Sequence, residues 1–357
     1  MLERPDAHVQ PPHEVKVWFK QWQKAPPTTL ATHPEIIDLG EGNIFPDSVK
    51  EVPWDYAKNA AEVFGAFMGL EGSPELGNKP PRYYEVDGIP GLLIYPSLLP
   101  TPSQRHLLSA LLHRDLSLPE HKTNMHIHYE VPYAEANSST PPNQRHPSFF
   151  SCSAQGLSLT PLDPASHTPL TVRRMLDKKL RWMTLGGQYD WTLKAYPSTP
   201  PQAFPADIKK LIEGLFPMKA EAAIANLYSP GDTLSIHRDV SETWAAPLVS
   251  ISLGCEALFL VALADNGGKG DWDAAPTVRR AVLRLRSGDA VLMSGESRYA
   301  WHGVPRVLAG TCPEGLRDWP AATTKLETSN RVAMGVKSEE DYEGYRGWLA
   351  GKRVNLN

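Results

Sequence analysis

The 357-residue sequence is poor in cysteine: Cys152, Cys255 and Cys312 are widely spaced, and no two of them form a CxxC pair. An odd and dispersed set of thiols argues against a disulfide framework and against a thiolate zinc site. We therefore expect a protein of a reducing compartment.

Long apolar runs and an excess of charge of one sign are also missing. No stretch approaches the roughly 20 apolar residues of a membrane-spanning helix. The first ten residues have neither the apolar core of a signal peptide nor the Arg-rich character of a mitochondrial presequence. The formal net charge is −4, so any contact with nucleic acid must depend on local basic patches. These absences predict a nuclear or cytoplasmic protein without membrane association.

Proline is abundant: most of the 34 prolines fall within the first 205 residues, where they interrupt long helices and favour loop-rich structure. Apolar residues at helical spacing still predict helices over 53–69, over 102–116, and after Pro205. The stretch 136–150 is predicted to be a surface loop.

From about residue 220 the pattern changes to short strand-like runs separated by turn residues. We expect strands over 220–229, 233–239, 248–254, 257–263, 281–287, 290–295 and 331–337. Many short strands in succession indicate an antiparallel sandwich or barrel rather than a βαβ sheet. The hydrophobic content of 41% is enough for a sizeable core in one large or two ordinary domains.

A histidine and a carboxylate stand two residues apart at the end of one expected strand. His237 and Asp239 would share one side of that strand, whereas Arg238 would point away. His302 follows the expected strand 290–295, and two imidazoles with one carboxylate are typical of a non-haem Fe(II) oxygenase. The alternative is a solvated ion pair at a strand end. A second histidine group, His121, His126 and His128, lacks a partner pattern.

Arg331 is a cation within the otherwise apolar stretch 331–337. A buried guanidinium requires a planar anionic partner, which a dicarboxylate co-substrate would supply. A core carboxylate such as Glu256 is the alternative partner.

Together these motifs resemble the AlkB family of Fe(II)- and 2-oxoglutarate-dependent dioxygenases. The resemblance is carried by Asn226-x-Tyr228, by "HRDVSE" at 237–242, by "SGDAVLMSGESR" and "HGVPRVL", and by Arg331. It is dense from 172 to 337 and is strongest to the eukaryotic AlkB-homologue-one branch. It implies a mainly β fold with flanking helices, built on a double-stranded β-helix or jelly roll. The expected organisation is a Pro-rich region 1–165 that buttresses the core, a nucleotide-recognition lid and linker 166–204, and a dioxygenase core 205–350.

The resemblance also implies roles for individual residues. The iron ligands would be His237, Asp239 and His302; the 2-oxoglutarate contacts would be Asn226, Tyr228, Arg331 and Lys337; the substrate contacts would be Trp182, Tyr189 and Glu242. Trp182 would stack on an extruded base, or else be an ordinary core aromatic. The cations Arg173, Arg174, Lys178, Lys179 and Arg181 would meet phosphates, or else form a solvated helix face.

Three positions depart from the family pattern. The final strand RxNxxxR would have Ala333 in place of Asn and Lys337 in place of the second Arg. Ser241 stands where bacterial members carry an acidic base-reading residue.

The implied reaction is oxidative demethylation of N-methylated bases, such as 1-methyladenine or 6-methyladenine, in tRNA, other RNA or DNA. It would consume 2-oxoglutarate and dioxygen, release formaldehyde, succinate and carbon dioxide, and act on an unpaired or flipped base. Two alternatives stay open: a histone or ribosomal hydroxylase or demethylase with the same iron site, and a nucleic-acid-binding module with impaired co-substrate binding.

Overall fold

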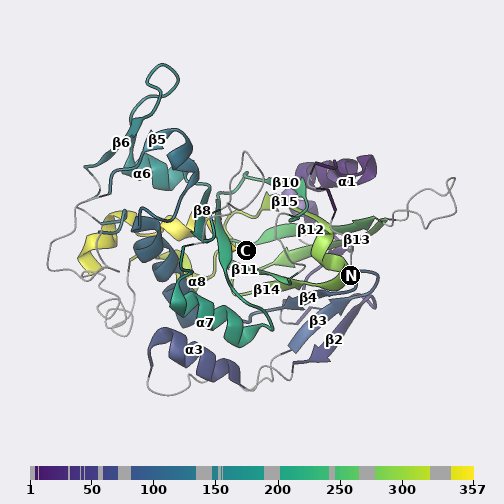
Figure 1. The fold of residues 1–357 in the computed structure, drawn as a ribbon. Coiled ribbons are helices and arrows are strands. Elements are labelled where there is room, and N and C mark those ends of the chain that lie inside the picture. Colours follow the sequence, from purple (N-terminus) through teal and green to yellow (C-terminus); the bar gives the residue numbers. More distant parts are fainter. Residues whose placement is uncertain are drawn as a thin grey trace.

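Two β-sheets face each other at the centre of the computed structural model (Figure 1). The structure describes residues 5–6, 8–30, 33–40, 42–43, 45–54, 59–70, 82–133, 147–151, 154, 156–188, 202–240, 246–264, 278–321 and 339–357. The five-stranded sheet contains β1 (Ile36–Ile37), β13 (Val278–Leu285), β12 (Ala257–Ala264), β15 (Trp301–Val307) and β10 (Leu234–His237), in that spatial order.

The second sheet has eight strands. In spatial order they are β2 (Val49–Pro53), β3 (Arg82–Val86), β4 (Leu92–Tyr95), β14 (Ala290–Met293), β11 (Leu248–Gly254), β16 (Arg353–Leu356), β9 (Ala222–Tyr228) and β8 (Trp182–Gly186). A separate three-stranded sheet consists of β5 (Tyr129–Glu130), β6 (Ser158–Pro161) and β7 (Leu170–Thr171). The expected mainly β, jelly-roll architecture is confirmed.

Helices flank the sheets. The α-helices are α1 (His13–Lys24), α2 (Pro27–Leu30), α3 (Ala60–Met68), α4 (Thr101–Ser109), α6 (Val172–Arg174), α7 (Ala206–Leu215) and α8 (Glu314–Arg317). Short 3-10 or π segments are η2 (Ala110–Arg114), η3 (Asp115–Ser117), η4 (Asn124–Ile127), η6 (Met175–Lys179), η7 (Gly295–Tyr299), η8 (Glu339–Tyr345) and η9 (Trp348–Gly351). Among the described helices, none combines the length and the apolar character needed to cross a bilayer.

Alternation along β12 shows how the five-stranded sheet is covered on both faces. Leu258 and Leu260 belong to a core cluster with Trp18 and Trp22 of α1, so this face lies under that helix. Phe259 and the other alternate side chains belong to the main core between the two sheets. One face of this sheet therefore points into the interior of the jelly roll.

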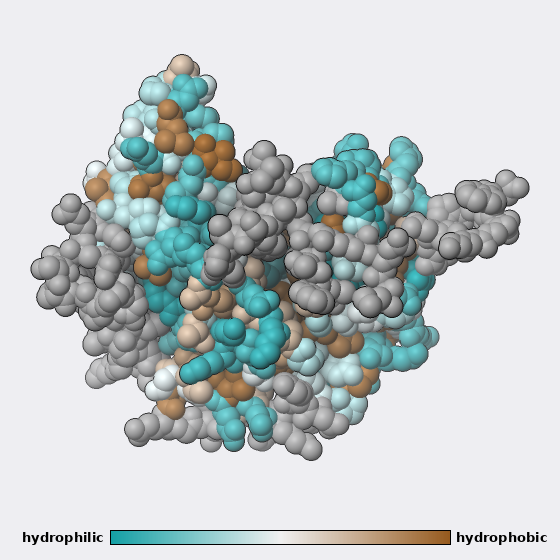
Figure 2. Space-filling view, viewed as in Figure 1, coloured by the Kyte–Doolittle hydropathy of each residue, from teal (hydrophilic) through white to brown (hydrophobic). Residues whose placement is uncertain are grey.

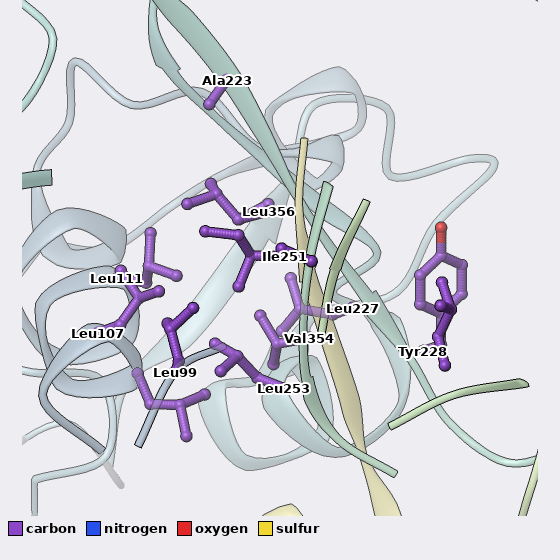
Figure 3. Close-up of a cluster of buried hydrophobic side chains, with 14 of the residues drawn as sticks. Leu99, Leu107, Leu111, Ala223, Leu227, Tyr228, Ile251, Leu253, Val354 and Leu356 are labelled. Carbon is purple, nitrogen blue, oxygen red and sulfur yellow. The ribbon is translucent and has the colours of Figure 1, made fainter. Parts of the chain in front are cut away.

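The eight-stranded sheet also has two distinct faces. Figure 3 shows Leu227 and Val354 on one side of the strands, together with Leu107 and Leu111 from α4 and η2, and Tyr228 on the other side. Because successive side chains alternate, residues adjacent to the aliphatic ones face the five-stranded sheet. This inner face is where polar residues of the site are found.

The helix predicted after Pro205 is confirmed as α7, whose Ile208, Leu211 and Leu215 are buried. The helix predicted over 102–116 is confirmed as α4 with its continuation through η2 and η3. The prediction over 53–69 was wrong at its start, because Pro53 ends strand β2 and the helix begins at Ala60. A proline lacks the N–H that a helix interior needs, but it is tolerated at the end of an edge strand such as β2.

The strands expected between 220 and 295 are confirmed as β9 to β14. The stretch 331–337 lies outside the described residues, as does most of the loop expected at 136–150. The expected domain division stays a prediction, and the structure adds that β2, β3 and β4 extend the core sheet through the pairing of β4 with β14.

Candidate metal and co-substrate site

Two histidines lie side by side on the inner face of the five-stranded sheet. His237 ends β10, and His302 is its direct partner on β15. His302 is also paired with Val261 of the inner face, so both imidazoles point into the jelly roll. A side chain at Gly303 would collide with the backbone of β10, 2.8 Å from the carbonyl oxygen of Leu234. Glycine at this position therefore permits the close approach of the two histidine-bearing strands.

Asp239 completes the cluster just beyond the end of β10. Ligand atoms of His237, Asp239 and His302 all lie within 4.8 Å of one another. Arg238 lies instead over the ring of Trp301, 4.0 Å from its centroid, on the α1 side of the sheet. The convergence of the three side chains, and the outward direction of Arg238, agree with the prediction from the HxD spacing.

Backbone carbonyls orient both imidazoles. His237 Nδ1 donates to the oxygen of Ser235 at 2.8 Å, and His302 Nδ1 donates to the oxygen of Ala300 at 3.1 Å. The two Nε2 atoms consequently face Asp239, at 3.6 Å for His237 and 3.4 Å for His302. A histidine whose Nδ1–H is bound in this way presents the Nε2 lone pair to a metal.

The three side chains of the cluster differ in solvent exposure: one is buried and two are partly exposed. The side chain of His302 is 3% exposed, whereas those of His237 and Asp239 are 34% and 26% exposed. Burial opposes ionisation of Asp239, but the two imidazoles outweigh it and hold the pKa of this carboxyl well below its usual range. The carboxylate is therefore ionised and able to act as an anionic metal ligand.

Arg298 fixes the position of Asp239, which lies outside a regular strand. The side chain of Arg298 is buried; it donates to the backbone oxygens of Asp239 and Ala246, each at 2.6 Å. One guanidinium thus ties together both ends of the connection between β10 and β11. Arg298 is in the sequence "GESR" and was not among the predicted site residues.

Opposite the metal cluster, neighbouring strands of the eight-stranded sheet bring polar residues into register. Tyr228 of β9 is paired with Arg353 of β16, and Asn226 is paired with Asn355. Direct partners point to the same face, which here is the inner face that carries Tyr228 in Figure 3. The predicted co-substrate residues Asn226 and Tyr228 are therefore accompanied by Arg353 and Asn355.

Arg353 is a buried cation without an anionic partner among the described residues. Its side chain is 1% exposed, its Nη atoms donate to Ser252 Oγ at 2.7 Å and to the oxygen of Cys255 at 3.2 Å, and its Nε has no partner. In the described part of the chain no carboxylate lies within ion-pair distance of it. Burial lowers the pKa of Arg353 to about 10. Such a site favours the binding of a carboxylate, which would compensate the desolvated charge.

Tyr228 adds a second donor to this site. Within the described residues its buried hydroxyl has no hydrogen-bond partner, and burial raises its pKa, so it stays a neutral phenol. Tyr228 is the direct partner of Arg353 on β16, so the phenol and the guanidinium lie on the same face of the sheet. An anion bound there would satisfy an orphaned hydroxyl as well as a guanidinium.

Among the described residues the final core strand is β16. Arg331, Ala333 and Lys337 lie outside the described residues. The alternative partner proposed for Arg331, Glu256, lies 2.6 Å from Arg284. The pattern RxN that marks the family's last strand is present intact as Arg353-x-Asn355, and its second arginine position falls beyond Asn357. That pattern is the signal by which the sequence could have identified β16, and it was missed.

Of the predicted substrate residues, Trp182 is described and is half-buried at the start of β8. It is paired with Asn226 and therefore shares the inner face with the co-substrate residues. It is not part of the hydrophobic core, so the core alternative is not favoured. Tyr189 and Glu242, together with Ser241, lie outside the described residues.

The structure does not bring the other two predicted clusters, the cations at 173–181 and the second histidine group, together into one site. All five cations are exposed. Arg173 forms an ion pair with Asp177 at 2.7 Å and Arg181 forms one with Asp232, whereas the other three form none with the described residues. The histidines His121 and His126 form separate local hydrogen bonds. The triad at His237 is the only group of three or more metal-type ligands among the described residues.

One sheet of the jelly roll carries two histidines and a carboxylate in the arrangement that holds Fe(II). The other sheet carries a buried arginine and a tyrosine that can bind an anion. Together these features are typical of a 2-oxoglutarate-dependent oxygenase. Comparison with known proteins agrees. The family model of the 2OG-Fe(II) oxygenase superfamily matches residues 91–357, and the chain belongs to this superfamily. Its cofactor is Fe(II), and its co-substrates are 2-oxoglutarate and dioxygen.

Individual relatives sharpen the comparison. The N6-methyladenosine RNA demethylase ALKB1 of Pyricularia oryzae is 42% identical over 99% of this chain and 96% of its own. The tRNA demethylase abh1 of Schizosaccharomyces pombe is 34% identical over 78% of this chain and 81% of its own. The nucleic acid dioxygenase ALKBH1 of Homo sapiens is 37% identical over 51% of this chain and 46% of its own. The AlkB-type resemblance seen in the motifs is confirmed.

Proposed function

We propose that the protein is an oxidative demethylase of N-methylated bases in RNA or DNA. The observation that carries this proposal is the placement of Trp182 in register with Asn226, beside the co-substrate site of an Fe(II)/2-oxoglutarate oxygenase. The names of the relatives support it, because they describe demethylation of N6-methyladenosine in RNA and of tRNA. The proposed substrate is an unpaired or flipped methylated base, whose extrusion costs least where pairing is absent.

In this proposal His237, Asp239 and His302 hold Fe(II), and Arg353 replaces Arg331 as the partner of a 2-oxoglutarate carboxylate. Iron loaded with 2-oxoglutarate and dioxygen supplies the chemistry that hydroxylates the N-methyl carbon. The resulting hydroxymethyl amine then loses formaldehyde.

The chain's own residues have three further tasks. Arg353 and the neutral Tyr228 phenol bind and orient the co-substrate, because both are buried donors without a full set of partners. His302 is buried, so water would have little access to a metal from this side of the triad. Trp182 offers a ring face on which the base stacks, worth about 1 to 3 kcal/mol.

The proposal is tested in two stages. Anaerobic titration of the apo-protein with Fe(II) and 2-oxoglutarate should produce a visible charge-transfer band that needs both components. Methylated single-stranded RNA and DNA oligonucleotides are then screened for formaldehyde release, with Trp182→Ala and Trp182→Phe in parallel. We expect Trp182→Ala to raise the KM for the oligonucleotide and Trp182→Phe to preserve it. Activity on peptides that is indifferent to Trp182 would instead assign a protein substrate.

A further inference from the structure

Three neighbouring strands of the eight-stranded sheet carry residues of the proposed site at the same end. Trp182 begins β8, Tyr228 ends β9 and Arg353 begins β16. The strands are adjacent in the order β16, β9, β8, and each neighbouring pair is antiparallel. The start of β8, the end of β9 and the start of β16 therefore lie together, and the position of these strand ends determines where both reactants would be held.

The residues next to these three in the chain form a polar network with a carboxylate of the turn between β9 and β10. This strand-end network consists of Arg181, Ser229, Lys352 and Asp232. Asp232 Oδ2 accepts the backbone N–H of Ser229 at 2.6 Å and forms an ion pair with Arg181. Lys352 Nζ donates to Ser229 Oγ at 2.8 Å. Asp232 is thus the residue through which the ends of all three strands are connected.

The strand-end network is less exposed than an ordinary charge pair at the surface. Hydrophilic residues cover much of the molecular face seen in Figure 2, but an exposed charge contributes little to position because water screens it. In the network, the side chain of Asp232 is 23% exposed, and Lys352 is 8% exposed. Burial lowers the pKa of Lys352 to about 8, and the carboxylates of Asp177 and Asp232 oppose that decrease. Hydrogen bonds to charged groups are roughly twice as strong as neutral ones, so this network can hold the strand ends in place.

A tight turn holds Asp232 against the end of β9. The backbone N–H of Asp232 donates to the oxygen of Ser229 at 2.9 Å, so the two residues bind each other twice. Gly231, between them, has a φ of 95°, a conformation that residues other than glycine rarely adopt. The iron ligands are held separately, because β10 pairs with β15 and Arg298 binds the backbone oxygen of Asp239. The carboxylate of Asp232 therefore acts on the strand ends without being needed for the metal cluster.

We propose that Asp232 is a positioning residue for both reactants. Its first branch runs through Arg181, which fixes the start of β8 and with it the ring of Trp182 that stacks on the base. Its second branch runs through Ser229 and Lys352, which fix the facing ends of β9 and β16, where 2-oxoglutarate binds. This inference rests on the proposed function, because it names a residue that aligns the base with the co-substrate. The competing assignment is a turn residue that serves folding alone.

The experiment separates the two branches of the network. Asp232→Ala removes both branches, whereas Asp232→Asn keeps an acceptor for the N–H of Ser229 and loses only the charge that Arg181 requires. Arg181→Met tests the first branch alone, and Ser229→Ala tests the second, because it removes the acceptor of Lys352. Glu51→Ala is the matched control: Glu51 also pairs with an arginine, but on β2, at the opposite edge of the same sheet.

Two measurements follow the two reactants. The anaerobic charge-transfer titration gives the affinity for 2-oxoglutarate, and formaldehyde release from a methylated single-stranded RNA gives KM and kcat for the substrate. We expect Asp232→Ala to weaken 2-oxoglutarate binding and to raise the KM for RNA, each about 3- to 10-fold, the effect of one lost hydrogen bond. The affinity for Fe(II), and kcat at saturation with both reactants, should stay unchanged.

The other variants should divide this effect between the reactants. Asp232→Asn and Arg181→Met should raise the KM for RNA and leave the affinity for 2-oxoglutarate at its wild-type value. Ser229→Ala should weaken 2-oxoglutarate binding and leave the KM for RNA unchanged, and Glu51→Ala should change neither. A residue that served only the folding of the turn would lower the Tm and would not separate the two reactants in this way.

Wild-type constants for both reactants in Asp232→Ala, or equal effects on both reactants in every single-branch variant, would overturn the proposal. If Asp232→Ala does not fold, the other three variants still decide the matter, because each removes a single contact. Failure of the demethylase function itself would be seen differently, as absence of formaldehyde from every methylated RNA with the wild type. The 2-oxoglutarate titration would then still test the second branch, because it requires no nucleic acid.

Discussion

The two inner faces of the jelly roll differ in how their residues are brought together. On the five-stranded sheet, two of the three metal ligands are only two positions apart, and the third is the direct partner of the first. On the eight-stranded sheet, the co-substrate residues come from β9 and β16, which are more than 100 residues apart in the chain but neighbours in space. A local pattern brings the first group together, whereas strand order brings the second group together.

The two faces also differ in how they hold charge. The metal ligands compensate one another, since two imidazoles lie beside one carboxylate. In the described part of the chain Arg353 has no ion-pair partner and donates to the neutral acceptors Ser252 Oγ and the oxygen of Cys255, so a bound anion would compensate its charge. Four experiments test this difference, from the largest expected effect to the smallest.

Asp239→Ala should have the largest effect, because it removes the anionic metal ligand. We expect stoichiometric iron binding to be lost and demethylation to fall by about a thousandfold or more. Iron content and formaldehyde release measure this, and binding of unmethylated RNA should be unaffected. Full iron occupancy in the variant would show that Asp239 is not a ligand.

Arg353→Met and Arg331→Met form a matched pair that decides which arginine serves the co-substrate. Removing one partner of a buried charge pair costs roughly 2 to 5 kcal/mol, so Arg353→Met should weaken 2-oxoglutarate binding by a factor of about 30 or more. Arg331→Met should change it little. The charge-transfer titration measures both, and Arg353→Lys should remain impaired because lysine lacks the planar fork. The opposite ranking of the two variants would return the role to Arg331.

Arg298→Met should loosen Asp239 without removing a ligand. Groups that orient a metal ligand contribute about 10- to 100-fold to metal affinity, and we expect a loss of Fe(II) affinity in this range. The affinity for 2-oxoglutarate at saturating iron should be nearly unchanged. Arg317→Met is the control, since Arg317 donates to the oxygen of Cys312 away from the site. Wild-type iron affinity in Arg298→Met would rule out the positioning role.

Tyr228→Phe should have the smallest effect on binding and an informative effect on stability. Loss of one hydrogen bond to the co-substrate should weaken 2-oxoglutarate binding about tenfold. The Tm without co-substrate should not fall, because the hydroxyl that is removed has no hydrogen-bond partner among the described residues. A clear decrease in Tm would mean that the hydroxyl has a structural role instead.

Local patterns allowed much of the fold and site to be predicted. The spacing of Ile208, Leu211 and Leu215 identified a helix, because a period of 3.6 residues can be recognised without knowledge of its neighbours. The start of α3 was missed, because pairing of Pro53 with Arg82 on β3 outweighs local helical preference. The separate three-stranded sheet was not predicted either, since its short strands are recognisable only once β5 and β6 are paired.

The sequence by itself indicated the proposed metal-ligand triad, the family and the chemistry, because the HxD spacing and the surrounding motifs lie within short stretches. Tertiary structure is what points to Arg353 as the arginine proposed for the co-substrate. Its strand β16 lies between β11 and β9, beside Tyr228, whereas the stretch 331–337 lies outside the described residues. Sheet order depends on the packing of the whole chain, so no local pattern can specify it.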